Sequence, residues 1–88
     1  MKYMVIERFK PGRVGDVYRR FAERGRMMPD RLRYIDSWIS ADLTTCYQLM
    51  ETDDADSFAE WTRNWDDLVE FEIVATVSSA EARSRALA

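Results

Sequence analysis

Three acidic residues lie within separate apolar stretches, where a carboxylate could do chemistry. Glu7 lies within KYMVIERF, Asp36 within LRYIDSWI and Glu72 within VEFEIVATV. If the fold brings them to a partly apolar cavity, crowding and desolvation would raise a carboxyl pKa toward that of a general base. The alternative is that these acids pair with arginines at a dimer seam. This plainer interpretation is favoured, because structural ion pairs also perturb pKa values.

Four further residues are candidates to contact a small molecule beside these acids: Tyr34, Trp38, Gln48 and Cys46. A cysteine of this kind is more often a small buried hydrophobe than a nucleophile, and the sequence has no histidine to activate it. The lack of histidine also removes the usual metal ligand. No loop has the regular acidic spacing of a calcium site, so we expect neither a metal nor a cofactor.

The elements that must position these residues follow from hydrophobic periodicity. Alternating or β-branched segments predict strands over residues 2–9, 32–39, 44–51 and 69–77. Apolar positions three, four or seven apart predict an amphipathic helix that begins at Val14 and whose end is marked by Gly25 and then Pro29. A second helix is predicted to be capped by Asp53 or Asp54. Residues 79–88 predict a short helix or a frayed tail. The order β-α-β-β-α-β in a single domain, 1–88, predicts a ferredoxin-like α+β fold with a four-stranded antiparallel sheet and both helices on one face.

The second helix should bury one stripe of large side chains, and alternation should sort the strands into a helix-covered face and an open face. The predicted stripe is Phe58, Trp61, Trp65 and Leu68. The residues predicted to face the helices are Met4, Ile6, Ile35, Ile39, Tyr47, Leu49, Val69, Phe71, Ile73, Ala75 and Val77. The residues predicted for the open face are Tyr3, Val5, Glu7, Phe9, Tyr34, Asp36, Trp38, Cys46, Gln48, Met50, Glu70, Glu72, Val74 and Thr76. Such an aromatic face is larger than monomers normally expose, which predicts a homodimer through the open face.

Four phrases, MKYMVIERFK, GRMMPDRLRYIDSW, CYQLMETDD and WDDLVEFEIV, resemble a family of small bacterial domains of unknown function in the dimeric α+β barrel superfamily. The resemblance extends to about residue 80. It implies the fold and the dimer, and it assigns no catalytic residue.

Charge is distributed unevenly along the chain. Residues 1–34 hold ten Lys and Arg against four acids, whereas residues 35–77 hold one base against eleven acids. We therefore expect arginines of the first half to neutralise acids of the second, including at least one of Asp66 and Asp67 in WDDLVEFEI. The acidic total, −3, and the lack of a binding motif argue against a nucleic-acid partner. The apolar runs are too short for a membrane span, and we expect a soluble, cytoplasmic protein.

Two classes of function remain open. The chain could be a non-catalytic homodimer that binds a small hydrophobic or aromatic metabolite in or beside the sheet. It could instead be a cofactor-independent enzyme of the monooxygenase or isomerase kind, with a carboxylate of the open face as general base. A ligand-sized cavity lined by the acids would favour the enzyme.

Overall fold

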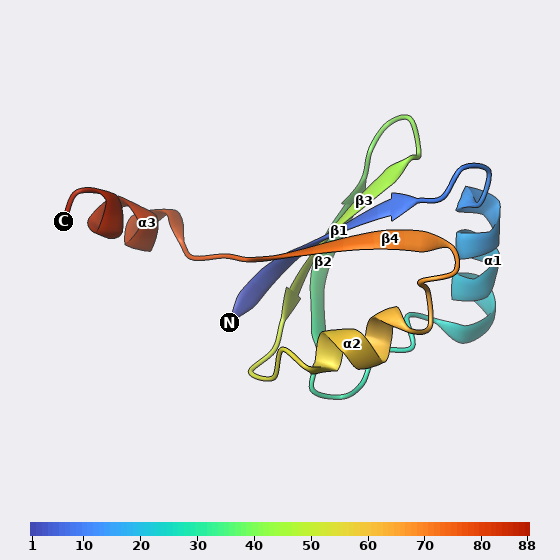
Figure 1. Cartoon of the computed structure of the whole chain (residues 1–88), viewed down its shortest axis with the longest axis horizontal. Coiled ribbons are helices and arrows are strands. Elements are labelled where there is room, and N and C mark those ends of the chain that lie inside the picture. The colour runs from blue at the N-terminus through green and yellow to red at the C-terminus, as the bar shows by residue number, and fades with distance from the viewer.

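The computed structural model covers residues 1–88 and has an α+β architecture (Figure 1). Its sheet is antiparallel, with the four strands in the order β2-β3-β1-β4. The elements in chain order are β1 (Lys2–Phe9), α1 (Val14–Arg24), β2 (Arg33–Ile39), β3 (Thr45–Glu51), α2 (Ser57–Thr62), β4 (Val69–Ala75) and α3 (Ser79–Ala86). The predicted order of strands and helices, and the antiparallel sheet, are confirmed.

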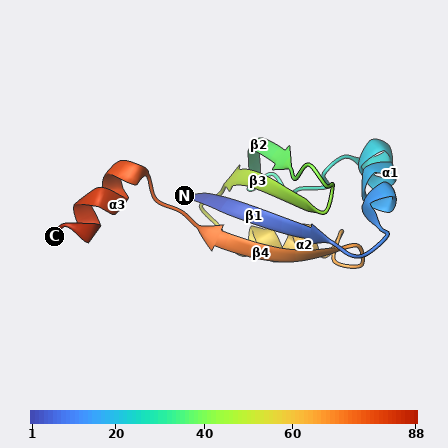
Figure 2. The same cartoon turned by 90° about the horizontal axis from the view of Figure 1, so that it is seen from above.

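The helices leave one face of the sheet uncovered. α2 lies behind the strands in Figure 2, whereas α1 stands at the end of the sheet where β1 finishes. The core is therefore built between α2, the segments around it and the covered face. Its buried members are Val5, Val17, Leu32, Met50, Phe58, Trp61, Trp65, Leu68 and Val69.

The predicted stripe of the second helix is confirmed as core, although the helix is shorter than its stripe. Phe58, Trp61, Trp65 and Leu68 are all at most 5% exposed, while α2 ends at Thr62. Turns carry the chain onward, with the Trp65 amide donating to the Thr62 carbonyl and the Leu68 amide to the Trp65 carbonyl. The apolar side chains therefore keep their spacing of three to four residues after the helix has ended.

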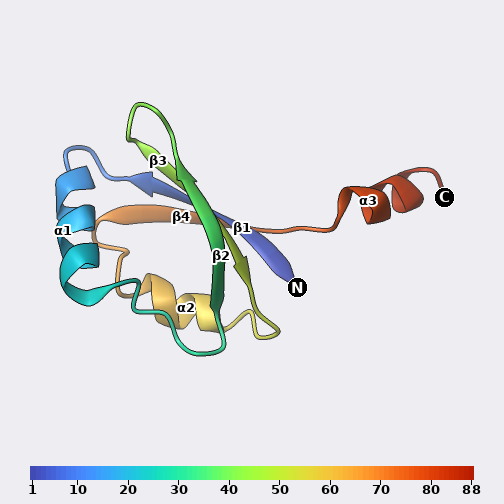
Figure 3. The same ribbon diagram turned by 180° about the vertical axis from the view of Figure 1, so that it is seen from behind.

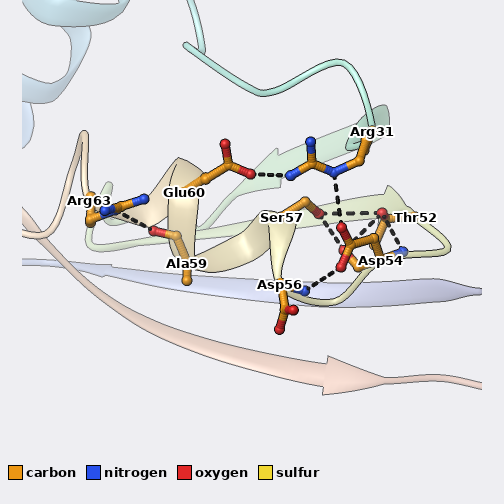
Figure 4. Close-up of polar contacts among 8 residues, drawn as sticks. All are labelled: Arg31, Thr52, Asp54, Asp56, Ser57, Ala59, Glu60 and Arg63. Carbon is orange, nitrogen blue, oxygen red and sulfur yellow. Dashed lines mark hydrogen bonds and ion pairs between the residues drawn. The ribbon is translucent and has the colours of Figure 1, made fainter.

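Polar contacts fix the start of α2 (Figure 4). The Asp54 carboxylate accepts a hydrogen bond from the Asp56 amide at 3.0 Å, so it stabilises the turn before the helix rather than the first helical turn. The fully buried Ser57 donates its hydroxyl to the Asp54 carbonyl at 2.6 Å. Arg31 bridges Asp54 and Glu60, which ties the loop before β2 to this helix.

The predicted faces are right for β4 and wrong for β1 and β3. Val69 and Phe71 of β4 pair with Phe9 and Glu7 and point to the covered face. Since directly paired residues share a face, Glu7 must point the same way. Alternation misassigned β1 and β3 because their apolar residues occur at both parities, as in Met4-Val5-Ile6, so the pattern does not distinguish the faces.

The corrected assignment exchanges the two sets of residues on β1 and β3. The covered face holds Tyr3, Val5, Glu7, Phe9, Cys46, Gln48 and Met50. The open face holds Met4, Ile6, Arg8, Thr45, Tyr47 and Leu49.

An irregularity in β2 changes the face of one more residue. Tyr34 pairs with Met50, but the next residue in register is Asp36, paired with Leu49. This bulge puts Tyr34 on the covered side and leaves Asp36 and Trp38 on the open face, as predicted for those two. Ile35 lies at the bulge and is 41% exposed, so its predicted place under the helices is wrong.

The C-terminal segment leaves the body of the domain. Figure 3 shows the chain continuing past the end of β4 and carrying α3 away from the sheet. Ser78 caps this helix by accepting a hydrogen bond from the Glu81 amide, and none of its residues is buried. The helical alternative predicted for this tail is therefore the observed one. No helix in the structure has both the length and the apolar character needed to cross a membrane.

Ion pairs join the basic first half to the acidic second half, as predicted. Arg20 makes a bidentate contact with Asp67, at 2.8 Å for each hydrogen bond. Of the two aspartates at the end of the tryptophan stripe, this is the one with an arginine partner. The other arginine pairs that join the two halves are Arg8–Glu72, Arg31–Asp54, Arg31–Glu60 and Arg33–Glu51.

Candidate functional site

A small cavity lies between α1 and the covered face of the sheet. Its volume is about 130 Å³. Most of its wall is apolar, and the lining residues are Glu7, Phe9, Val17, Tyr18, Phe21, Arg26, Ser37, Ile39, Cys46, Gln48, Trp61 and Trp65. It exists because α1 stands at the end of the sheet, so that only Val17 of this helix is buried while Tyr18 and Phe21 are 45% and 39% exposed.

Glu7 is the one carboxylic acid of this cavity. The residue is only 5% exposed, and its Oε2 atom has no hydrogen-bond partner. Burial raises the pKa of Glu7 to about 7, against smaller lowering effects of the Arg26 charge and of the Cys46 thiol. A buried polar atom without a partner is costly, so an unpaired carboxyl oxygen beside a cavity is well placed to meet a ligand.

Cys46 lies next to Glu7, since the two residues pair directly across β1 and β3. Burial, and secondarily the negative charge of Glu7, raise the pKa of the thiol to about 12. The thiolate is the nucleophilic form of cysteine, so at neutral pH this side chain is an inert part of the wall.

Arg26 supplies the cationic group of the cavity, and its position is fixed at both ends. The indole Nε1 atoms of Trp61 and Trp65 both donate to the Arg26 carbonyl oxygen at 2.9 Å. The guanidinium carbon lies 3.6 Å from the centroid of the Tyr34 ring and 5.0 Å from that of Phe21. Cation–π contacts of this kind hold the charge in place without neutralising it.

The hydrogen-bonding capacity of Arg26 is largely unused. Its Nε donates to Gln48 Oε1 at 3.4 Å, a long contact, and the guanidinium forms no ion pair with a carboxylate. A guanidinium carries five N–H donors in a planar fork. Arg26 therefore brings free donors to the same cavity as the unpaired oxygen of Glu7.

The candidate residues named from the sequence divide between the two faces. Glu7, Gln48 and Cys46 meet in the cavity, and Tyr34 lies against Arg26. They are on the covered face, so their predicted place on the open face is wrong.

The remaining candidates, Asp36, Trp38 and Glu72, are on the open face as predicted. Glu72 pairs there with Arg8 at 3.0 Å, and both side chains are about half exposed. The three candidate acids are therefore not brought together, because the sheet separates Glu7 from the other two.

The sequence reasoning missed the cavity role of Arg26, which it treated only as a counter-charge. It also treated Trp61 and Trp65 as core alone, although both line the cavity. One signal was present: Arg26 directly follows Gly25, the glycine that ends α1 and lets the chain turn. Periodicity alone does not identify which arginine of the first half turns inward.

The comparisons give a family and nothing beyond it. No curated protein and no solved structure matches this chain. One family model matches along its full length, residues 1–88, and that model is described as a domain of unknown function. The chain therefore belongs to the family Domain of unknown function (DUF3303).

Proposed function

We propose that this protein is a small homodimeric domain that binds a compact hydrophobic or aromatic molecule in the cavity under α1. One observation carries the proposal: Glu7 lines a largely apolar cavity, and its buried Oε2 atom has no partner. A few convergent polar groups within an apolar wall are what small-molecule sites have in common. The place differs from the one expected from the sequence, since the ligand lies on the covered face.

The size of the cavity limits the ligand. Drug-sized ligands occupy about 300–1,000 Å³, whereas an engineered apolar cavity of about 150 Å³ binds benzene. At about 130 Å³ this cavity fits one ring or an equivalent branched chain. The partly exposed Tyr18 and Phe21 form its rim, so substituents of the ligand can extend toward solvent.

The three tryptophans provide a direct test by nuclear magnetic resonance. Trp61 and Trp65 line the cavity and Trp38 lies on the opposite face, 54% exposed. We expect benzene, as an uncharged one-ring probe, to shift the indole N–H signals of Trp61 and Trp65 in a saturable way and to leave that of Trp38 unchanged.

A matched pair of variants makes the test specific. Val17→Phe adds a ring from the cavity wall, and Ala22→Phe adds the same ring to an exposed position of α1. Benzene should fail to shift the indole signals of folded Val17→Phe and should still shift those of Ala22→Phe. Equal responses of the two variants, or no saturable response in the unmodified protein, would overturn the proposal.

A second candidate function is proton abstraction by Glu7. A general base works best when its pKa lies near the operating pH, and that of Glu7 is about 7. In this cofactor-independent enzyme of the isomerase or monooxygenase kind, the Glu7 carboxylate takes a proton from carbon and leaves an enolate or similar carbanion. Bound one-ring ketones should exchange their α-hydrogens with deuterated solvent. Glu7→Gln should stop the exchange while the indole shifts persist, and exchange at an equal rate would exclude this role.

The open face supports the proposal of a homodimer, arranged as in the ferredoxin-like dimeric α+β barrels. Trp38, Tyr47 and Val74 on this face are each at least 40% exposed, and the half-buried Met4, Ile6 and Leu49 lie among them. A contiguous apolar patch of this kind usually marks an interface. A second copy fits it best, because the Arg8–Glu72 pair on the same face offers both signs of charge to a self-complementary contact.

A further inference from the structure

Two unsatisfied polar groups of opposite chemistry border the same cavity. Glu7 presents an oxygen without a partner, and Arg26 presents donors that contact no carboxylate. Building on the proposed function, we infer that the cavity takes a compact carboxylic acid, whose carboxylate is bound by the Arg26 guanidinium and by the protonated carboxyl of Glu7. No ion pair joins the two groups to each other, so a ligand that accepts hydrogen bonds from both can meet them together.

The guanidinium selects for an anion. The guanidinium contacts the rings of Tyr34 and Phe21. The backbone carbonyl of Arg26 accepts hydrogen bonds from Trp61 and Trp65, so the arginine needs little ordering when a ligand binds. Arginine forms bidentate, charge-assisted hydrogen bonds with carboxylates, and such bonds are roughly twice as strong as neutral ones. A neutral ligand would form only weaker hydrogen bonds with these donors.

Glu7 selects for an anion only while it holds its proton. As a carboxylate it would repel an acid, whereas as a carboxylic acid it donates a hydrogen bond to one. The other titratable groups facing it are Arg26 after α1, Tyr18 from α1 and Cys46 from β3, while β2, β4 and α2 contribute no charge to the cavity wall. Burial, and then the neighbouring Cys46 and Glu7, raise the pKa of Tyr18. Tyr18 and Cys46 are therefore both neutral at pH 7. Binding should therefore be coupled to proton uptake by Glu7.

Benzoate and benzamide form a matched pair of probes, since they share a ring and nearly the same shape but differ in charge. Titration calorimetry with the full chain should give tighter binding of benzoate than of benzamide at pH 6. Because only the protonated fraction of Glu7 accepts the anion, and its pKa is about 7, benzoate should bind about tenfold more weakly at pH 8 than at pH 6. Benzamide should show no such change.

Variants separate the two groups. Glu7→Gln should remove the pH dependence and keep benzoate binding at pH 8, because an amide also donates a hydrogen bond. Arg26→Gln should weaken benzoate at least tenfold and leave benzamide unchanged. Arg24→Gln removes a charge from an exposed position on α1 outside the cavity, and it should behave like the unmodified protein.

The outcome is distinguishable from a failure of the proposed function. If benzene shifts the indole signals of Trp61 and Trp65 but benzoate binds no better than benzamide, the cavity is a ligand site and the acid specificity is wrong. The acid specificity is also wrong if benzoate affinity is equal at pH 6 and pH 8, or if Arg26→Gln binds benzoate like Arg24→Gln. If neither benzene nor benzoate perturbs these signals, the proposed function falls as well.

Discussion

The guanidinium of Arg26 lies 3.6 Å from the centroid of the Tyr34 ring, on the side of the sheet that the helices cover. The contact depends on the bulge in β2, because a regular strand with Asp36 and Trp38 on the open face would place Tyr34 there too. One irregularity in the strand therefore lets an aromatic ring support the charge that borders the cavity.

The other end of Arg26 is fixed by hydrogen bonds from the tryptophan stripe. Both indole N–H groups reach one backbone oxygen, and the following residue, Met27, has φ 58, in the left-handed region that non-glycine residues rarely occupy. The core residues Trp61 and Trp65 thus have a second role, since they position the loop that carries the cation.

Glu7→Gln should make the protein more stable at neutral and alkaline pH. Because the folded pKa of Glu7 is raised from 4.5 to about 7, the folded state binds the proton more tightly than the unfolded state. The contribution of Glu7 to the free energy of unfolding is greatest below pH 4.5. It falls by about 3 kcal/mol in total as the pH rises from 4.5 through 7. The glutamine carries no charge, so its variant should unfold at a higher urea concentration than the unmodified protein at pH 8.

The control for this comparison is Glu23→Gln, which removes a charge from an exposed position on α1. Both variants should be measured at one protein concentration, because a dimer makes apparent stability depend on concentration. A difference between Glu7→Gln and the unmodified protein that stays constant from pH 5 to pH 8 would contradict the assigned titration.

The sequence was sufficient for the architecture because several signals agree on each element. The stripe Phe58, Trp61, Trp65 and Leu68 has one apolar face, and in β4 the acids Glu70 and Glu72 alternate with apolar residues. In such segments the pattern indicates a single face that can be buried against the core. In β1, by contrast, Met4, Val5 and Ile6 are all apolar, and Glu7 would ordinarily mark the solvent side.

The faces of Glu7 and Gln48 were mispredicted for the same physical reason. Glu7 and Gln48 are buried on the covered face, whereas binary patterning assigns polar residues to the exposed face. The bulge that brings Tyr34 to the covered face depends on how β2 pairs with β3, and this register cannot be read from a single sequence. Two of the residues that violate the pattern, Glu7 and Gln48, are therefore ones that border the cavity.

Trp61→Ala should cost about 3–5 kcal/mol of unfolding free energy. The residue is 2% exposed, and its loss would leave a cavity and remove one of the two donors to the Arg26 carbonyl. Trp38→Ala is the matched control, because Trp38 is 54% exposed on the open face. Urea denaturation at concentrations where the protein is monomeric should show a large drop in unfolding free energy for Trp61→Ala only. Equal drops for the two variants would mean that Trp61 is wrongly assigned to the core.

Cys46 should be almost unreactive toward iodoacetamide at pH 8 in the folded protein. The residue is 6% exposed, and its pKa of about 12 leaves very little thiolate. In 6 M guanidinium chloride the same thiol should be labelled at the rate of a free cysteine, as followed by mass spectrometry. Labelling of the folded protein at a comparable rate would show that the thiol is open to solvent.

The open face should be the dimer interface, so a charge placed on it should produce a monomer. Trp38→Glu inserts a carboxylate where two copies would meet, and burying an unpaired charge is strongly unfavourable. Light scattering at micromolar concentration should give twice the 10.4 kDa chain mass for the unmodified protein and a single chain for the variant. Glu72→Gln should weaken the dimer to a smaller degree, because Arg8 loses its partner. A monomeric unmodified protein would overturn this assignment.

Asp67→Asn should weaken the fold modestly, and the effect should vanish in acid. The bidentate contact with Arg20 lowers the pKa of Asp67 to about 2, so this pair contributes stability above the ordinary pKa of 3.8 and loses it as pH falls toward 2. The Asp67 side chain is 56% exposed, so solvent screening limits the contribution to about 0.5–1 kcal/mol. Asp66→Asn is the natural control, since Asp66 is exposed and has no arginine partner. Denaturation midpoints at pH 7 should fall for Asp67→Asn and stay constant for Asp66→Asn, and the two variants should converge near pH 2. If Asp66→Asn is the more damaging change at pH 7, the charge at this turn is balanced by a different contact.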